Sequence, residues 1–346
     1  MTPHGAPTTV RPATADTVVV EARGLGKTYA LHVPWTDRLL RRAGALEVHA
    51  VEDVSFTIAR GRTLALVGES GCGKSTLARM MVGLETPTRG SAWLDCQDVH
   101  ATLAAAGGPA RALRRRMQMI FQDPYASLNP RWRIGAIVAE PLLEQGLIAP
   151  AQAPQRVAAL LASVGLKGAD VRKFPHQFSG GQRQRISIAR AIATGPEFLV
   201  CDEPTSALDV SVQAQVLNLL VELQRERALT CLFISHNLVV VRYVADDVGV
   251  MYLGRLVELA PKSELFAAPR HPYTRMLLAA VPDLHSRARE RAPVLGEVPD
   301  PLAPPPGCTF HPRCPHANER CRVERPALLP SGAVRVACHA VEEGRI

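Results

Sequence analysis

Residues 66–80 read LVGESGCGKSTLARM, and this stretch decides the fold. An apolar run, Thr63–Val67, precedes its glycines, and apolar residues at helical spacing follow from Thr76 to Leu84. Between them, Gly68–Thr76 fits the pattern G-x-x-x-x-G-K-[ST] in the strand-to-helix context that this pattern requires. The glycines let the backbone curl so that successive N–H groups point at phosphate oxygens, and the helix N-terminus adds its positive end. We therefore predict a phosphate-binding loop for a nucleotide.

Two side chains of this loop are predicted to contact the phosphates and a metal ion. Lys74 is a compact point charge that would reach the β- and γ-phosphates, and the Ser75 hydroxyl would ligate Mg²⁺. The residues predicted to bind the nucleotide are Gly68, Glu69, Ser70, Gly71, Cys72, Gly73, Lys74, Ser75 and Thr76.

Acidic residues end a second apolar run, as is typical of the strand that faces such a loop. Residues 198–203 read FLVCDE. Asp202 would hold Mg²⁺ through its water shell, and Glu203 would polarise a water against the γ-phosphate. His236 follows the next apolar run, in the stretch FISHN at 233–237, and so lies at a strand terminus on the same expected ligand edge.

Strands alternate with helices along the middle of the chain. The strand candidates Phe198–Cys201 and Cys231–Ile234 flank a helix-like segment, Val212–Gln224. Two further strands are predicted near the N-terminus, at Thr17–Glu21 and Val51–Ile58. This alternation predicts an α/β domain with a largely parallel sheet.

Other segments are predicted to be additions to that domain. Residues 1–16 are rich in Pro, Thr and Ala and are predicted to be disordered, and residues 34–46 form an insertion between two strands. Residues 130–172 are rich in Ala and Leu without strand signals, which predicts an inserted helical subdomain. From Pro269 onward Pro, Arg and Cys dominate, so residues 269–346 are predicted to form a separate C-terminal extension.

Composition narrows the class of protein less than the motifs do. The 346 residues are 47% hydrophobic and carry a formal charge of +8, a mild basic excess that suits nucleotide phosphates, nucleic acid or anionic lipid alike. No apolar run approaches the roughly 18 to 20 residues needed to cross a bilayer, and the N-terminus lacks the order of a secretory signal. We therefore expect the chain to stay in the cytoplasm.

A second predicted anion-binding helix start lies at residues 178–186, FSGGQRQRI. One nucleotide does not need two such loops from one subunit. At these residues the chain resembles the ATP-binding cassette (ABC) ATPases, whose SGGQ signature completes the ATP site of the opposite subunit in a head-to-tail dimer. The resemblance covers roughly residues 17–268. The signature residues predicted to contact the partner's nucleotide are Ser179, Gly180, Gly181 and Gln182.

The resemblance implies a P-loop NTPase cassette. Its core would be a RecA-like parallel sheet with an antiparallel β part, and the helical subdomain would occupy about residues 125–185. It also implies that Tyr29 stacks on adenine, that Gln122 senses Mg²⁺ and the membrane partner, and that the D-loop with Asp209 crosses the dimer interface. Glu203 would be the catalytic base and His236 the switch histidine.

Three segments are similar to those of bacterial oligopeptide and dipeptide importer ATPases: residues 121–131, FQDPYASLNPR, residues 251–283, and the insertion at residues 34–46. The chain looks more like the second ATPase of the usual pair. This resemblance implies a related ATPase partner, two transmembrane permease subunits, an extracytoplasmic solute-binding protein and a peripheral position on the cytoplasmic face of the inner membrane. Nickel and other small-solute importers share this subfamily, so the solute is left open.

Four cysteines crowd into the tail, at Cys308, Cys314, Cys321 and Cys338. Five, six and sixteen residues separate them, unlike the two-to-four-residue pairs of common zinc sites. Thiolates at looser spacing suit a [4Fe–4S] cluster, and such a tail also occurs in the importer subfamily. Two alternatives stay open: a zinc ion held with the help of His311, His316 or His339, and four free structural thiols. Disulfides are disfavoured in the cytoplasm.

Two other functions are considered for a cassette ATPase. A role on nucleic acid or in translation would use a basic surface, yet the arginines at 111 and 114–116 lack interleaved aromatics and are interpreted as a solvated helix face. We therefore expect no nucleic-acid partner. The second of these functions is that of a metal- or redox-responsive regulatory ATPase. Membrane co-fractionation with hydrophobic partners would separate import from both.

Overall fold

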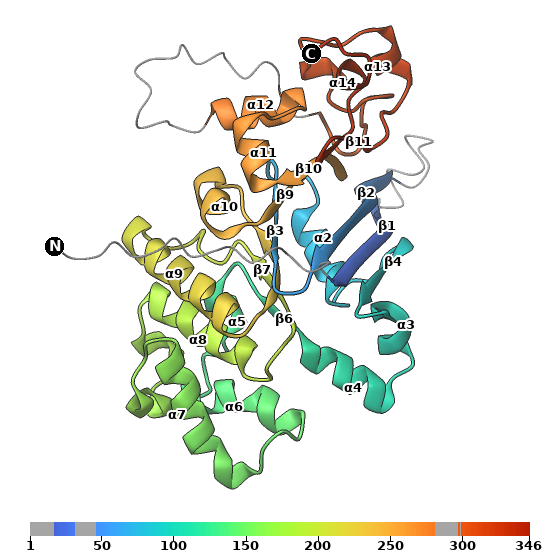
Figure 1. Cartoon of the computed structure of the whole chain (residues 1–346). Helices are drawn as coiled ribbons and strands as arrows, with labels where there is room; N and C mark the ends of the chain where they lie inside the picture. Colours follow the sequence, from blue (N-terminus) through green and yellow to red (C-terminus); the bar gives the residue numbers. More distant parts are fainter. Residues whose placement is uncertain (1–16, 32–45, 281–296, 298) are drawn as a thin grey trace, which may run out of the picture.

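The structure is a computed structural model that describes residues 17–31, 46–280, 297 and 299–346 (Figure 1). The prediction of disorder at residues 1–16 lies outside the described residues. The insertion predicted at 34–46 also lies outside them, except for Leu46, where a strand begins.

The main sheet has eight strands in the order β11-β12-β10-β9-β3-β8-β7-β6. Five neighbouring strands of this sheet run parallel to one another: β9, β3, β8, β7 and β6. Beyond β9 the sheet continues with antiparallel pairing through β10, β12 and β11. The α/β fold with a largely parallel sheet is thus confirmed. The bounds are β3 Thr63–Val67, β6 Met117–Ile120, β7 Phe198–Asp202, β8 Thr230–Ile234, β9 Asp247–Tyr252, β10 Arg255–Pro261, β11 Leu329–Ser331 and β12 Val334–Val336.

Strand β3 lies inside this sheet with both faces covered. All five of its residues are buried, as expected for a central parallel strand. Leu64 and Leu66 belong to the core cluster that includes the N-terminal strands and α2, whereas Ala65 and Val67 belong to the cluster that includes the helical subdomain. The alternation of side chains along β3 therefore joins two hydrophobic cores across one sheet.

A second, antiparallel sheet packs beside the first and has the order β2-β1-β4-β5. The two predicted N-terminal strands are present but are much longer than expected. Polar residues along their exposed faces, such as Glu21 and Arg23, interrupt the apolar signal without ending the strands, and the pairing is irregular at several points. The bounds are β1 Val18–Leu31, β2 Leu46–Ala59, β4 Arg89–Leu94 and β5 Gln97–Asp98.

Helices cover the main sheet and build the predicted helical subdomain. Between β6 and β7 every described element is helical, and Figure 1 shows α6 and α7 projecting at the end of the molecule far from the C-terminus. The bounds are α2 Lys74–Met81, α3 Val99–Ala104, α4 Gly107–Arg116, α5 Pro124–Ser127, α6 Ile134–Glu144, η1 Pro150–Gln152, α7 Ala153–Ser163, η2 Gly168–Arg172, η3 Pro175–Gln177, α8 Gly180–Ile192, α9 Val210–Glu226, α10 Leu238–Val244 and α11 Lys262–Ala267.

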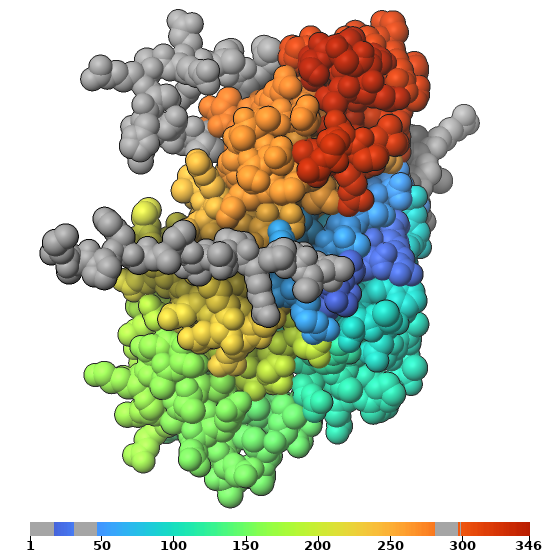
Figure 2. All heavy atoms as spheres, in the orientation of Figure 1, coloured from blue at the N-terminus to red at the C-terminus, as the bar shows by residue number. Residues whose placement is uncertain are grey.

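The C-terminal extension shares the main sheet with the cassette. Strand β12 pairs with β10 through Glu258–Val336 and Leu259–Arg335, and β11 then pairs with β12. Figure 2 shows the red part of the extension, residues 299–346, packed on the orange segment that includes α12 and on the blue N-terminal strands. Its division from the cassette at residue 269 stays a prediction. The bounds are α12 Pro272–Ala279, η4 His311–Arg313, α13 Glu319–Val323 and α14 His339–Glu342.

A buried histidine lies where the extension leaves the cassette. The carboxylate of Glu258, fully buried on β10, accepts hydrogen bonds from the backbone N–H groups of Arg270 and His271. His271 then caps α12, because its Nδ1 accepts from the Tyr273 N–H at 3.0 Å. Burial lowers the pKa of His271 to about 3.

We expect this histidine to make the fold acid-sensitive. In the unfolded chain His271 binds a proton below about pH 6.5, but in the folded chain only near pH 3, so stability is lost as the pH falls between these values. Urea titrations at pH 7 and pH 4.5 should show a loss of about 2.5 kcal/mol in the free energy of unfolding from this group. His271→Asn, which can still accept at the helix cap, should show a smaller loss over the same interval. An equal loss in both proteins would rule His271 out as the cause.

Candidate nucleotide site

The loop between β3 and α2 adopts a backbone shape that only glycine tolerates at two points. Gly71 has φ 78° and Gly73 has φ 100°, both in the left-handed region. A Cβ at Gly73 would lie 2.1 Å from the carbonyl oxygen of Ala50 on β2. The two glycines therefore let the loop turn tightly against β2 before the helix begins.

The ammonium group of Lys74, at the start of α2, is turned back over this loop. It is buried and donates hydrogen bonds to the carbonyl oxygens of Gly68 at 2.8 Å and Glu69 at 2.9 Å. A buried cation on this loop supplies the positive charge that a phosphate group requires.

Ser75 and Asp202 bring a hydroxyl and a carboxylate together beside the loop. The Ser75 hydroxyl donates to Asp202 Oδ1 at 2.9 Å. Asp202 is the last residue of β7, and burial raises its pKa although the Ser75 hydrogen bond and the nearby Arg79 oppose that shift. Two oxygen donors at the carboxyl edge of a parallel sheet are the ligand type that Mg²⁺ prefers, so these residues fit the predicted metal ion.

Glu203 meets the two other predicted catalytic side chains. Its Oε2 accepts from Gln122 Nε2 at 3.3 Å and lies 3.1 Å from His236 Nδ1. The Glu203 backbone has φ 44°, unusual for a residue with a side chain, and its N–H donates to the carbonyl of Ile234 on the neighbouring strand. The Glu203 carboxylate, just after β7, thus contacts side chains from two other segments, which follow β6 and β8.

Tyr29 lies on β1 at the edge of this region. It pairs with Val48 on β2, two residues before Ala50, whose carbonyl oxygen faces the Cβ position of Gly73. The Lys27 ammonium lies 5.0 Å from the centre of its ring, and the ring is only partly buried. Its stacking on adenine stays a prediction.

The signature residues begin a second helix, α8, in which Ser179 and Gln182 are exposed, Gly180 is half-buried and Gly181 is buried. Ser179 caps the helix by accepting from the Gln182 N–H, while Gln182 Oε1 accepts from the Ser179 N–H at 3.1 Å. Gly180 and Gly181 follow, and a Cβ on Gly181 would lie 2.2 Å from a methyl carbon of Val212. In the described part of the chain no hydrogen bond links Ser179 or Gln182 to the Lys74 loop.

The segment predicted to cross a dimer interface lies beside the signature. Asp209 is the N-cap residue of α9 and is exposed. Val210, which follows it, has 83% of its surface exposed. Leu208, just before Asp209, lies 3.4 Å from where a Cβ on Gly180 would be.

Sequence reasoning missed the partner of Glu69, which was predicted only as a loop residue. Arg313 of the extension donates to both carboxylate oxygens of Glu69, at 2.9 and 3.1 Å. The two residues are 244 positions apart, and no local pattern connects them. Tyr273, also in the extension, accepts from the Glu69 N–H at 3.0 Å.

The four tail cysteines lie near one another. Burial raises the pKa of Cys308 to about 12 and also raises those of Cys314 and Cys338, and the four tail cysteines, Cys321 included, lie near enough to affect one another. Among the described residues, however, no group of three or more His, Cys, Asp or Glu side chains is arranged to hold a metal ion. The iron–sulfur and zinc alternatives are therefore not supported by this arrangement.

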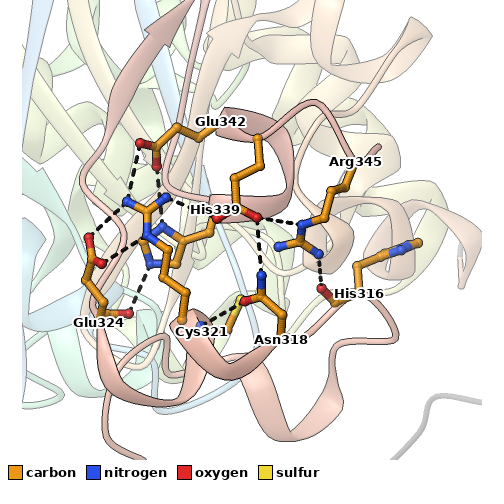
Figure 3. A network of polar contacts seen from close by, with 9 residues as sticks. His316, Asn318, Cys321, Glu324, His339, Glu342 and Arg345 are labelled. Carbon is orange, nitrogen blue, oxygen red and sulfur yellow. Dashed lines mark hydrogen bonds and ion pairs between the residues drawn. The ribbon is translucent and has the colours of Figure 1, made fainter.

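Two of the tail histidines, His311 and His339, already have hydrogen-bond partners for a ring nitrogen. Figure 3 shows His339 between Glu324 and Glu342, with Nε2 3.0 Å from the Glu324 carbonyl oxygen and Nδ1 3.3 Å from Glu342 Oε2. His311 Nδ1 lies 2.9 Å from the Cys308 carbonyl oxygen. The rings of His311 and His339 are thus part of the hydrogen-bond network of the extension.

Within the described residues, no helix is both long enough and apolar enough to cross a membrane.

The arginine run at the end of α4 is largely exposed. Its residues Arg111, Arg114 and Arg115 are exposed, in agreement with a solvated helix face. Arg116, the last residue of α4, instead pairs with Glu197 at 2.7 Å.

Comparison with known families and proteins gives matches over both parts of the chain. Residues 51–206 match the ABC transporter family, and residues 257–321 match the family described as the oligopeptide/dipeptide transporter C-terminal region. The chain is 52% identical over 301 residues to the di/tripeptide transport ATP-binding protein DppF of Pseudomonas aeruginosa, covering 87% of this chain and 92% of that one. It is 49% identical to the dipeptide transport ATP-binding protein DppF of Escherichia coli, covering 86% and 88%.

Solved structures agree with the fold. CbiO1 of Clostridium perfringens, part of the ABC transporter complex cbiONQ, aligns with a TM-score of 0.59 and 26% identity over 72% of this chain and 91% of that one. The cassette MJ0796, described as a dimer in a post-hydrolysis state with ADP and phosphate, aligns with a TM-score of 0.59 and 25% identity over 70% and 98%. The alternatives of a nucleic-acid ATPase and a metal-responsive regulator gain no support from these relatives. The chain belongs to the ATP-binding proteins of the ABC transporter family, in the branch that carries the oligopeptide/dipeptide transporter C-terminal region.

Proposed function

We propose that this chain is the ATP-hydrolysing subunit of an importer for dipeptides or oligopeptides. The observation that carries the hydrolytic part is the meeting of Gln122 and His236 on the Glu203 carboxylate. This group lies directly after Asp202, which contacts Ser75 of the phosphate loop. The relatives named for peptide transport support the solute class.

The residues present fit ATP and Mg²⁺. Bound MgATP would supply the phosphoryl group whose transfer to water releases energy. Lys74 would donate to the β- and γ-phosphates after leaving the loop carbonyls, and Ser75, Gln122 and Asp202 would surround the metal ion. Glu203 would take the proton of the attacking water, and His236 would hold the carboxylate in place from 3.1 Å.

The nucleotide site needs a second subunit to be complete. Ser179 and Gln182 are exposed and begin a helix whose N-terminus is suited to a phosphate. The dimer described for the related cassette MJ0796 supports a pair in which each signature faces the partner's phosphate loop. We propose that the partner is a related ATPase subunit, so that the pair is a heterodimer.

Placing a large cation at Ser179 should separate ATP binding from turnover. Ser179→Arg puts bulk where the partner's γ-phosphate would lie, so ATP binding to the isolated chain should be unchanged, while hydrolysis by the assembled transporter falls about tenfold or more. Fluorescent-ATP titration and phosphate release measure the two effects. His176→Arg, an exposed change on η3 outside the signature, serves as the control. Normal hydrolysis in Ser179→Arg would remove the cross-subunit site.

The membrane partners are proposed from the same relationship. Peptide transport requires permease subunits and a solute-binding protein outside the membrane, and this chain would sit peripherally at the cytoplasmic face. A groove beside the Gln122 segment, lined by Leu84, Phe121, Pro141 and Gln145, joins the cassette to the helical subdomain. Phe121 is 38% exposed there, and Leu84 is 58% exposed. We infer that a permease segment docks in this groove and receives the closing motion.

The tail cysteines have a separate test, because a [4Fe–4S] cluster in them would be an addition to the ATPase and not a part of it. Protein purified without oxygen should be analysed for iron, sulfide and zinc. Iron and sulfide in similar amounts with absorption near 400 nm would establish the cluster against the present arrangement. About one zinc per chain would establish a zinc site. Protein that contains neither iron nor zinc would leave the alternative of four structural thiols.

A further inference from the structure

We propose that Arg313 of the C-terminal extension is a positioning residue for the phosphate loop, acting through its ion pair with Glu69. The inference rests on the proposed binding of ATP by this loop. The extension thereby takes part in nucleotide binding, although Arg313 lies 244 residues from Glu69 in the sequence.

Glu69 is held through all three of its polar groups. Its carboxylate accepts two hydrogen bonds from Arg313, at 2.9 and 3.1 Å. Its backbone N–H donates to the Tyr273 hydroxyl at 3.0 Å, and its carbonyl oxygen accepts from Lys74 at 2.9 Å. Two residues of the extension therefore fix the same loop residue that holds the lysine.

Arg313 is itself rigidly placed. Its side chain is only 3% exposed, and its guanidinium lies 5.8 Å and 5.9 Å from the ring centres of Tyr252 and Phe310. Its backbone N–H donates to the Phe310 carbonyl in the short turn η4. Contact with Glu69 raises the pKa of Arg313, so the guanidinium stays charged in the physiological range.

The charge of Glu69 explains why this pair would affect ATP. An unpaired carboxylate within a loop that receives phosphates repels them, and a buried guanidinium without its partner is strongly unfavourable. The bidentate pair with Arg313 neutralises that carboxylate and fixes its direction. Tyr273 meanwhile turns the Glu69 N–H toward the extension. The extension thus completes the outer wall of the phosphate loop.

The decisive test compares single and double variants of the full chain. Arg313→Gln leaves Glu69 unpaired, and we expect its Kd for a fluorescent ATP analogue with Mg²⁺ to rise about tenfold. Arg313→Lys, which keeps the charge but not the bidentate geometry, should lie between it and the wild type. Glu69→Gln/Arg313→Gln removes both charges and should recover most of the lost affinity. In the assembled transporter KM should rise with kcat nearly unchanged.

A matched ion pair away from the loop separates positioning from stability. Arg116 contacts Glu197 through two hydrogen bonds, at 2.7 and 3.0 Å, so Arg116→Gln should lower the melting temperature without changing the Kd. If Arg313→Gln folds poorly, Tyr273→Phe keeps the buried ring and removes only the hydroxyl that holds Glu69, and its Kd should rise about threefold.

The outcomes distinguish this inference from the proposed function. Wild-type affinity in both Arg313→Gln and Tyr273→Phe would overturn the positioning role, as would a double variant that binds no better than Arg313→Gln. A wild-type chain that does not bind the ATP analogue at all would instead overturn the proposed nucleotide site. Recovery in the double variant with unchanged affinity in Arg116→Gln would establish the role of Arg313.

Discussion

Replacing Glu203 by Gln should abolish most ATP hydrolysis while leaving ATP bound. The amide keeps the size of the side chain and a partner for His236, but it cannot take a proton from the attacking water. We expect kcat to fall by roughly 10² or more, which corresponds to about 2.7 kcal/mol of lost transition-state stabilisation. Phosphate release by the assembled transporter measures the turnover, and ATP titration measures the binding.

A second expectation follows from the same substitution. Because ATP stays intact, two cassettes should remain closed on it, so the Glu203→Gln protein should accumulate as an ATP-bound dimer in size-exclusion chromatography. Glu197→Gln, at a partly exposed position just before β7, is a suitable control because its carboxylate pairs with Arg116 and not with the site. Hydrolysis near the normal rate in Glu203→Gln would remove Glu203 as the base.

Replacing Lys74 by Ala should act earlier, on ATP binding itself. Lys74 is the buried cation of the loop, and in this structure it donates hydrogen bonds to the carbonyl oxygens of Gly68 and Glu69. Without it the phosphates lose a charge-assisted contact, and we expect the Kd for ATP to rise by about 10²-fold or more. Isothermal titration with MgATP measures the change.

The contrast between these two variants is the informative result. Glu203→Gln should bind ATP and not turn it over, whereas Lys74→Ala should fail to bind at concentrations that saturate the wild type. Lys167→Ala provides the control, since Lys167 is an exposed lysine of the helical subdomain, outside the loop. ATP affinity close to wild type in Lys74→Ala would contradict the assignment of the loop.

Short-range sequence patterns predicted the centre of the fold well. The bounds of β3 are those of the predicted run at 63–67, since a fully buried strand is a continuous apolar segment with no polar interruption. Helix α2 ends earlier than predicted, at Met81 instead of Leu84, because Gly83 follows with φ 71° in the left-handed region. The long N-terminal strands were underestimated because one face of each carries polar residues.

Long-range contacts were beyond the reach of those patterns. The spacing of residues within Gly68–Thr76 predicts a phosphate loop, yet it contains no information on Arg313 or Tyr273, which reach Glu69 only after the chain has folded. In the same way, the composition of residues 269–346 predicts a C-terminal extension but contains no information on the pairing of β12 with β10 of the main sheet. Such pairings depend on tertiary packing, which local periodicity does not encode.

The tail cysteines illustrate a different limit. Their number predicts metal or thiol chemistry, but geometry decides between these, and spacing in the sequence does not determine how the sulfur atoms are arranged. In the described residues His339 is engaged with Glu324 and Glu342, and no three candidate ligands converge. Direct measurement of iron, sulfide and zinc therefore decides whether the tail cysteines bind a metal.

The central claim, that this chain energises peptide import, is tested most directly by uptake in the organism that encodes it. Cells lacking the chain should be supplied with radiolabelled dipeptides, tripeptides and longer peptides, and then complemented with the wild type or with Glu203→Gln. The account predicts that uptake of at least one peptide class is lost on deletion, returns with the wild type and does not return with Glu203→Gln. Uptake of every class unchanged by the deletion, or restored equally by Glu203→Gln, would contradict it.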